Sequence, residues 1–171
     1  MQKTTQEIID IIINSEKTFF ILCGLPYSGK THFAQEITKN IPIEYISIDD
    51  IFHERGYDWN SNKLPDEKGW AEIFDVAYKK IEVSLSKNLN VLYDSTNHTK
   101  SSRDALRNIA HRVGAETNVI FLDIPVETIY SRWKENKLNQ TRHVVDKKLI
   151  DMTVETFEKP TEDENLITVK E

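Results

Sequence analysis

The stretch "CGLPYSGKTHF", residues 23–33, contains two of the five glycines in the chain together with the doublet Lys30-Thr31. It directly follows the apolar run "TFFIL" (18–22), and after it apolar residues recur every fourth position along 30–41. A buried strand, a glycine-containing loop and an amphipathic helix therefore follow one another without interruption.

The loop fits the pattern G-x-x-x-x-G-K-[ST] at 24–31. Glycines let such a loop bend so that its backbone N–H groups surround a phosphate, and the helix beginning after it directs its positive end to the same place. We expect Lys30 to reach the outer phosphates and the Thr31 hydroxyl to ligate Mg²⁺; a glycine turn with an exposed lysine is the alternative. The residues expected to contact the nucleotide are Gly24, Leu25, Pro26, Tyr27, Ser28, Gly29, Lys30, Thr31 and His32.

Four further apolar runs, at 43–48, 90–94, 118–123 and 166–169, are nearly continuous rather than alternating, as in strands buried on both faces of a parallel sheet. Helical patterns lie around them, at 4–14, 66–87, 101–113, from Pro125 onward and around 145–152. This alternation predicts a single α/β domain over 1–171: a P-loop NTPase three-layer α/β/α sandwich with right-handed crossovers, a five-stranded parallel sheet and a helical lid.

Composition narrows the classes of partner. The net charge is −6, the hydrophobic fraction 39% and the charged fraction 29%, as in a soluble globular chain. No apolar run approaches the roughly 20 residues of a membrane span, and acidic residues flank the short apolar run near the N-terminus, which argues against a signal peptide. The single cysteine, Cys23, excludes an internal disulfide. We therefore expect a cytoplasmic protein without a membrane partner, and the acidic balance argues against long nucleic acid.

The second apolar run ends in "YISIDDIF", with Asp49 and Asp50 at its carboxyl end, where ligands bind in parallel sheets. Phosphoryl transfer to a hydroxyl benefits from a carboxylate that accepts the hydroxyl proton. We assign that role to Asp49 and expect Asp50 to be the N-cap of the next segment. The alternative is that both residues only cap a helix.

The third run ends in "NVLYDSTNHTKSSR". Asp94, at the strand end, is expected to hold Mg²⁺, usually through water. Thr96 and Asn97 offer neutral hydrogen-bonding groups toward a substrate, although a turn leading to a helix N-cap near Ser101 explains them equally. Arg103 falls in the first turn of that helix, where a cation is unfavourable against the helix dipole, which suggests an anionic partner.

The stretch "SRWKENKLNQTRHVVDKK" (131–148) is strongly basic and is the expected lid. A closing arginine stabilises the charge that spreads over a transferring phosphoryl group, and Arg132 and Arg142 are the candidates. For the remaining basic residues we expect a solvated helix face: Lys134, Lys137, Lys147 and Lys148.

The connection 50–66 should lie over the acceptor side of the site. Its Arg55 and His53 could bind a small polar ligand, and Tyr57 and Trp59 could either stack on that ligand or anchor the loop to the fold. The five histidines lack metal-ligand spacing, so no zinc site is expected. A guanine-reading Asn-Lys-x-Asp is also missing from the sequence, which favours ATP over GTP.

Taken together, these motifs resemble the small P-loop kinases related to the polynucleotide 5′-kinase domain, over most of the chain. The resemblance rests on "GLPYSGKT", "ISIDD", "LYDSTN" followed by Arg103, "SRWKEN" and the tail "FEKPTEDE", which is similar to that of bacterial AAA-type ATP-binding kinase-like proteins. It implies a kinase core with ATP and Mg²⁺. Asp49 matches the general base of that family, Lys30 and Thr31 its phosphate and metal residues, and Arg132 lies where its lid arginines begin.

The sequence departs from that family at two places. Polynucleotide kinases carry an arginine shortly after the acidic pair, whereas here Phe52 and His53 come first and Arg55 later, which puts a nucleic-acid end as substrate in question. The second lid arginine falls on Asn136, and Arg142 from the following loop is the expected substitute.

The sequence thus predicts an ATP-dependent kinase that transfers the γ-phosphate to a hydroxyl of a small molecule or of a nucleic-acid 5′ end. The alternative is a regulatory protein that binds and slowly hydrolyses ATP without an acceptor. The residues assigned provisionally to the acceptor are Asp49, Arg55, Thr96, Asn97 and Arg103.

Overall fold

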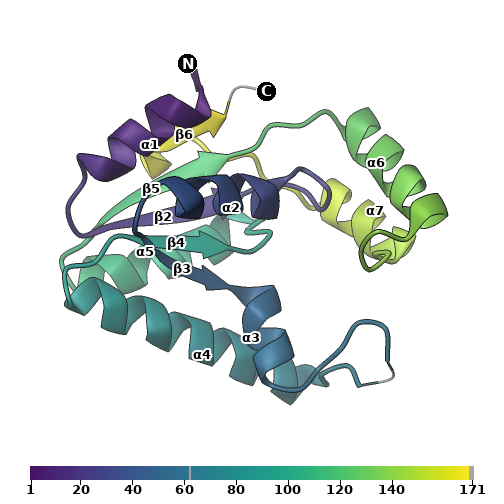
Figure 1. Ribbon diagram of the computed structural model, residues 1–171. Coiled ribbons are helices and arrows are strands. Elements are labelled where there is room, and N and C mark those ends of the chain that lie inside the picture. The colour runs from purple at the N-terminus through teal and green to yellow at the C-terminus, as the bar shows by residue number, and fades with distance from the viewer. Residues whose placement is uncertain (62, 170–171) are drawn as a thin grey trace.

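The computed structural model describes residues 1–61 and 63–169, and residue 62 of the expected 50–66 connection lies outside them. Its sheet is parallel, with strand order β1-β6-β5-β2-β4-β3 (Figure 1). The strands are β1 Gln2–Lys3, β2 Thr18–Cys23, β3 Glu44–Ser47, β4 Val91–Asp94, β5 Glu116–Phe121 and β6 Leu166–Val169. The helices are α1 Thr5–Ile13, α2 Lys30–Asn40, α3 Ile48–Glu54, α4 Glu67–Ser86, α5 Lys100–Arg112, α6 Val126–Asn139 and α7 Lys147–Glu155, with a 3₁₀ turn at Glu162–Glu164.

Strand β2 lies inside the sheet, between β5 and β4, and all six of its residues are buried. Phe19, Ile21 and Cys23 pack with α3, α4 and α5, whereas Phe20 and Leu22 pack with α1 and α2 on the other face. This two-sided burial explains why the strand is continuously apolar. The predicted three-layer α/β/α sandwich is confirmed, with helices on both faces of the sheet (Figure 1).

Two details differ from the expectation. The sheet has six strands rather than five, because Gln2 and Lys3 pair with Thr168 and Val169 at its edge. A two-residue polar strand leaves no apolar run for sequence analysis to detect. The helix after β3 also begins earlier than expected: its N-cap is Ser47, whose hydroxyl accepts a hydrogen bond from the backbone N–H of Asp50. Asp50 is therefore in the first turn and is not the N-cap.

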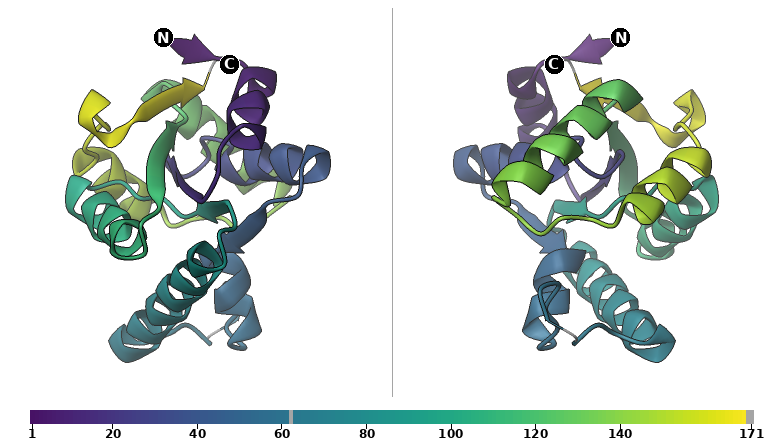
Figure 2. Two further views of the ribbon diagram at one scale, coloured as in Figure 1. Left: turned by 90° about the vertical axis from the view of Figure 1, so that its left-hand side faces the viewer. Right: turned by 90° about the vertical axis from the view of Figure 1, so that its right-hand side faces the viewer.

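Beyond the carboxyl ends of the strands, α6 and α7 form a separate layer (Figures 1 and 2). They have a small core of their own, in which Ile129, Trp133 and Ile150 pack with Leu25 and Tyr27 of the 24–29 loop. The expected lid segment 131–148 covers most of α6, the connection after it and the start of α7. The lid therefore packs its own apolar core against two residues of the phosphate-loop segment.

Candidate active site

The loop Gly24–Gly29 connects β2 to α2, and its two glycines are there for different reasons. A Cβ on Gly24 would lie 2.8 Å from Oγ of Ser28 and 3.2 Å from the carbonyl oxygen of Leu122. Gly29 is the N-cap of α2 and has φ +93°, a left-handed conformation that favours glycine. The first glycine therefore allows close packing under the loop, and the second allows the turn into the helix.

Lys30, the first residue of α2, is buried, and its side chain turns back to the loop. Its Nζ donates to the carbonyl oxygens of Gly24 and Leu25, both at 2.8 Å, and lies 3.4 Å from Oγ of Ser28. Burial lowers the pKa of Lys30 from 10.5 to about 8, while the carboxylate of Asp94 opposes the shift. The ammonium group is thus bound by two carbonyl oxygens of the loop and lies near the Asp94 carboxylate.

Thr31 and Asp94 meet at the carboxyl ends of β2 and β4. The Thr31 hydroxyl donates to Oδ2 of Asp94 at 2.9 Å, and the Tyr45 hydroxyl donates to the same oxygen at 2.9 Å. Asp94 itself is buried. A hydroxyl and a carboxylate side by side are oxygen ligands of the kind that Mg²⁺ prefers, so the pair expected from the sequence to serve a metal is brought together.

Asp49 lies in the first turn of α3, next to the end of β3. The register of Ser47 with Asp94 places this turn beside the end of β4. Partial desolvation and the Asp94 carboxylate raise the pKa of Asp49, and the positive charge of Arg142 limits the rise. The Asp49 side chain nevertheless remains accessible to solvent. The residue is therefore a reachable carboxylate with increased basicity.

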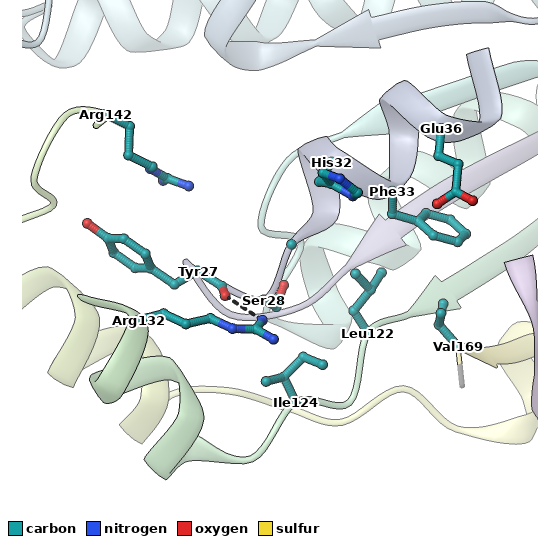
Figure 3. A pocket seen from close by; sticks show the side chains of 11 residues that line it. Tyr27, Ser28, His32, Phe33, Glu36, Leu122, Ile124, Arg132, Arg142 and Val169 are labelled. Atoms are coloured by element: carbon teal, nitrogen blue, oxygen red, sulfur yellow. Dashed lines mark hydrogen bonds between the residues drawn. The ribbon is translucent and has the colours of Figure 1, made fainter. Parts of the chain in front are cut away.

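Both candidate lid arginines approach Tyr27, a loop residue with φ +65° (Figure 3). Nη1 of Arg132 donates to the Tyr27 carbonyl oxygen at 3.1 Å. The guanidinium carbon of Arg142 lies 4.5 Å from the centre of the Tyr27 ring. Within the described residues, the Arg142 guanidinium makes no hydrogen bond or ion pair, so its charge is available to an anion.

A cavity of about 400 Å³ opens beside the loop. Its lining includes both lid arginines and four residues of the predicted nucleotide-contacting set, namely Tyr27, Ser28, Gly29 and His32 (Figure 3). A chamber of this size, with two cations and the start of α2 on its wall, suits a phosphorylated ligand.

The structure gives Arg103 and Asn97 other partners than a substrate. Arg103 is fully buried and forms two hydrogen bonds with the Glu164 carboxylate, at 2.6 and 3.1 Å. The anionic partner suggested by its position is thus a residue of the same chain. Asn97 is buried as well, and its Nδ2 donates to the carbonyl oxygen of Leu22 at 2.7 Å, joining the segment after β4 to β2.

Arg55 is also engaged elsewhere, since its Nη2 forms an exposed ion pair with Glu72 of α4 at 3.1 Å. Thr96 contributes its carbonyl oxygen, which accepts a hydrogen bond from the Gly24 N–H at 3.3 Å. Its half-buried side chain makes no hydrogen bond within the described part of the chain. Of the provisional acceptor residues, Asp49 and Thr96 therefore have side chains that are not already committed to another residue.

The aromatic residues of the 50–66 connection pack together. The Trp59 ring stacks on Phe52, with centroids 4.4 Å apart, and on His143 of the lid connection, with centroids 5.2 Å apart. Tyr57 packs on Phe52 as well, with centroids 5.7 Å apart. This arrangement favours the anchoring role over direct stacking on a ligand, and it brings the connection against the lid.

Sequence reasoning missed Tyr45 and Asn136 as site residues. Tyr45 stands two positions before Ser47 on the same face of β3, and only the pairing of β3 with β4 brings it to Asp94. Asn136 is buried in α6 and donates to the Tyr27 hydroxyl at 3.1 Å. Its interruption of the basic pattern of the lid was the one signal available in the sequence.

The tail motif "FEKPTEDE" has a structural role. Glu164 pairs with Arg103, and a carboxylate oxygen of Glu158 accepts from the Lys100 N–H at the start of α5 at 2.5 Å. Lys159 pairs with Asp123 after β5 at 3.0 Å. The tail is thus joined to α5 and to the segment that follows β5.

The fold and this arrangement define a small P-loop kinase-like protein. The family model described as "Chromatin associated protein KTI12" matches residues 17–169, and the chain belongs to this family. The described part of the chain contains no helix that is both long enough and apolar enough to cross a membrane.

Two proteins that match over most of the chain are informative. A probable gluconokinase of Schizosaccharomyces pombe is 26% identical over 158 residues, covering 90% of this chain and 79% of that protein. The crystal structure of Chaetomium thermophilum Kti12 in complex with ADP-AlF3 is 18% identical, with a TM-score of 0.59 and 88% of each chain covered.

The third match is to part of a longer protein. One chain of the Pnkp1/Rnl/Hen1 RNA repair complex is 22% identical, with a TM-score of 0.69 over 81% of this chain. The match covers 43% of the length of that chain, and in a second structure of the complex it covers 38% of the matched chain. At these identities the two structures establish likeness of fold.

Proposed function

We propose that this protein is an ATP-dependent phosphotransferase that moves the γ-phosphate to a hydroxyl of a small molecule or of a nucleic-acid 5′ end. One observation carries the proposal. The buried ammonium of Lys30, the Thr31–Asp94 pair and the reachable carboxylate of Asp49 converge at the strand ends, with the available guanidinium of Arg142 acting on both Lys30 and Asp49. A protein that only held a phosphate would not need a carboxylate of raised basicity at this place.

The P-loop is suited to exchange its internal hydrogen bonds for bonds to phosphate. Lys30 now donates to two loop carbonyl oxygens, and a phosphate oxygen could take their place as a charged, stronger acceptor for the ammonium. The negative charge of a bound phosphate would also favour the ammonium form of Lys30 and would oppose the lowering of its pKa by burial. The resemblance to ATP-dependent kinases and the missing guanine-reading motif support ATP as the nucleotide.

The Thr31 hydroxyl and the Asp94 carboxylate are the groups that would hold Mg²⁺, directly or through water. When bound there, the ion would neutralise charge on the phosphate oxygens. Tyr45 fixes the Asp94 carboxylate by its hydrogen bond to Oδ2, which leaves Oδ1 free of that contact. Thr31 and Tyr45 thus both donate to one oxygen of the Asp94 carboxylate and orient it.

Asp49 would accept the proton of the acceptor hydroxyl as its oxygen attacks phosphorus. Its pKa, raised by desolvation and by Asp94, makes it the stronger proton acceptor, and the positive charge of Arg142 limits the rise. Arg142 and Arg132 both contact Tyr27, from where they would stabilise the charge of the transferring group.

The acceptor is tested by a screen. ADP release is measured with ATP, Mg²⁺ and each of a set of hydroxylated metabolites, sugar acids included, and 5′-OH oligonucleotides. The related probable gluconokinase supports the first group, and the likeness to the Pnkp1-containing complex supports the second. Lys30→Ala should abolish transfer. Asp49→Asn should lower kcat by about 10²–10⁴-fold while sparing ATP binding, and Asp50→Asn is the matched control. Full activity of Asp49→Asn would refute the base assignment.

A second candidate function is ATP-dependent regulation without an acceptor. Membership of the KTI12 family favours it, because the family description names a chromatin-associated protein rather than a kinase. In that case ADP would form slowly in the absence of any acceptor, and no hydroxyl compound would accelerate it. Asp49→Asn would then have little effect, whereas Lys30→Ala would still abolish ATP turnover.

A further inference from the structure

Asn136 is an uncharged polar residue buried inside the lid, with 6% of its surface exposed. Its Oδ1 accepts from Oγ1 of Thr141 and from the backbone N–H of Arg142, both at 3.1 Å. Its Nδ2 lies within hydrogen-bonding distance of the carbonyl oxygens of Arg142 and His143, at 3.2 and 3.3 Å, and of the Tyr27 hydroxyl at 3.1 Å. Both ends of this amide are therefore fully used.

These bonds fix the backbone of Arg142 from two sides, because the same side chain accepts from its N–H and donates to its C=O. The chain reaches this position by a tight reversal after α6, where Gln140 has φ +47° and donates its N–H to the Asn136 carbonyl oxygen at 2.7 Å. The segment 140–143 is thus folded back onto Asn136.

Tyr27 extends the same network into the P-loop. Its hydroxyl also accepts from the Val145 N–H at 3.3 Å, and its ring lies under the Arg142 guanidinium at 4.5 Å. Figure 3 shows the Tyr27 side chain between Arg142 and Arg132. A phosphate-loop residue in a left-handed conformation is therefore bound to the lid by its ring, hydroxyl and carbonyl group.

The lid connection is held on its other side as well. His143, next to Arg142, stacks on Trp59 of the acceptor-side connection, with ring centroids 5.2 Å apart. The segment that carries Arg142 is therefore fixed between the P-loop and the acceptor-side connection.

We infer that Asn136 is the positioning residue that sets Arg142 over the phosphate loop, through Tyr27, and so makes the lid arginine part of a preorganised site. This inference rests on the proposed function in that Arg142 is taken to face the transferring phosphoryl group. If the guanidinium were displaced by about 1 Å from its productive position, the rate of transfer could fall by about 10²-fold. The amide at 136 therefore acts on the chemistry without touching the substrate.

The test compares the binding of ADP with that of ADP and aluminium fluoride, a mimic of the transferring phosphoryl group, by calorimetry. The wild-type protein should bind the fluoride complex more tightly than ADP. The margin is the ratio of these two affinities measured for the same variant, and Asn136→Ala and Arg142→Ala should each lose about 10–100-fold of it. The double variant should lose no more than Arg142→Ala alone, because both changes remove one interaction. Asn139→Ala, an exposed asparagine of the same helix, is the matched control and should keep the margin.

Tyr27→Phe provides a second variant for the case that Asn136→Ala fails to fold. It removes the hydroxyl bonds to Asn136 and Val145 but keeps the ring under Arg142, and should lose part of the margin. The inference would be overturned if folded Asn136→Ala kept a normal margin or if the losses in the double variant were additive. It would also be overturned if the wild-type protein showed no margin. A normal margin in the wild type without transfer to any acceptor would instead overturn the proposed function alone.

Discussion

Replacing Arg103 by methionine should destabilise the protein strongly, because it leaves the Glu164 carboxylate buried without its partner. Both side chains of this pair are completely buried, and the two hydrogen bonds between them are 2.6 and 3.1 Å long. Removing one member of such a pair costs about 3–5 kcal/mol. For a domain of this size the loss corresponds to a fall in Tm of about 6–20 °C.

Urea unfolding followed by circular dichroism measures this change, with Arg112→Met as the matched control. Arg112 lies on the same helix and forms an exposed pair with Glu82 at 3.5 Å, so its loss should cost about 0–1 kcal/mol. Equal stabilities of the Arg103→Met variant and the wild type would refute the structural role of the pair. If the acceptor KM were then altered, the original expectation that Arg103 binds a substrate anion would regain support.

The same pair predicts a pH dependence. Burial works against ionisation of Glu164, but the hydrogen bonds from Arg103 and from the backbone N–H of Thr161 together hold its pKa below the usual 4.5. The stabilisation is therefore fully present above about pH 4.5 and is lost as the pH falls through the lower value in the folded state. The stability difference between the wild type and Arg103→Met should shrink over this acidic range. A difference that stays constant down to complete acid unfolding would contradict this linkage.

Three further changes probe the site. Tyr45→Phe frees one side of the Asp94 carboxylate and should weaken Mg²⁺-dependent ATP binding about 10-fold in calorimetry, with no effect on binding measured in EDTA; equal loss in both would refute the role. ATP affinity should fall as the pH rises above about 8, where Lys30 loses its proton in the free protein, and Lys30→Met should abolish this slope; an unchanged slope would assign it elsewhere. Gly24→Ala brings a Cβ to 2.8 Å from Oγ of Ser28 and should cost about 1–3 kcal/mol of stability in urea unfolding, partly restored by adding Ser28→Ala; no restoration would place the strain elsewhere.

The sequence predicts most of the fold because the relevant signals are local. The phosphate loop lies within one stretch of residues, and its glycines serve a turn and a close approach that any P-loop requires. The buried strands are readable because both of their faces are covered, which makes them continuously apolar. β1 could not be predicted, since its two residues are polar and pair only at the sheet edge.

The expected metal pair follows from the sequence for a similar reason. Thr31 and Asp94 each stand at the carboxyl end of a strand, and parallel strands bring such ends to the same edge. The exact neighbours of Asp94 do not follow, because they depend on the strand order. Tyr45 reaches Asp94 only because β3 pairs with β4, across 49 positions of sequence.

The sequence by itself thus determined the strand–loop–helix unit, the layered α/β fold and the acidic residues at the strand ends, since these depend on local spacing and on burial. Only the tertiary structure decided which charge meets which. Arg103 pairs with Glu164, 61 positions away, instead of with an anionic ligand. Asn136 binds the backbone of Arg142 because the loop after α6 folds back onto that helix. Such pairings depend on the order of strands and the path of loops, because a buried charge or amide must be matched by whatever partner the fold places beside it.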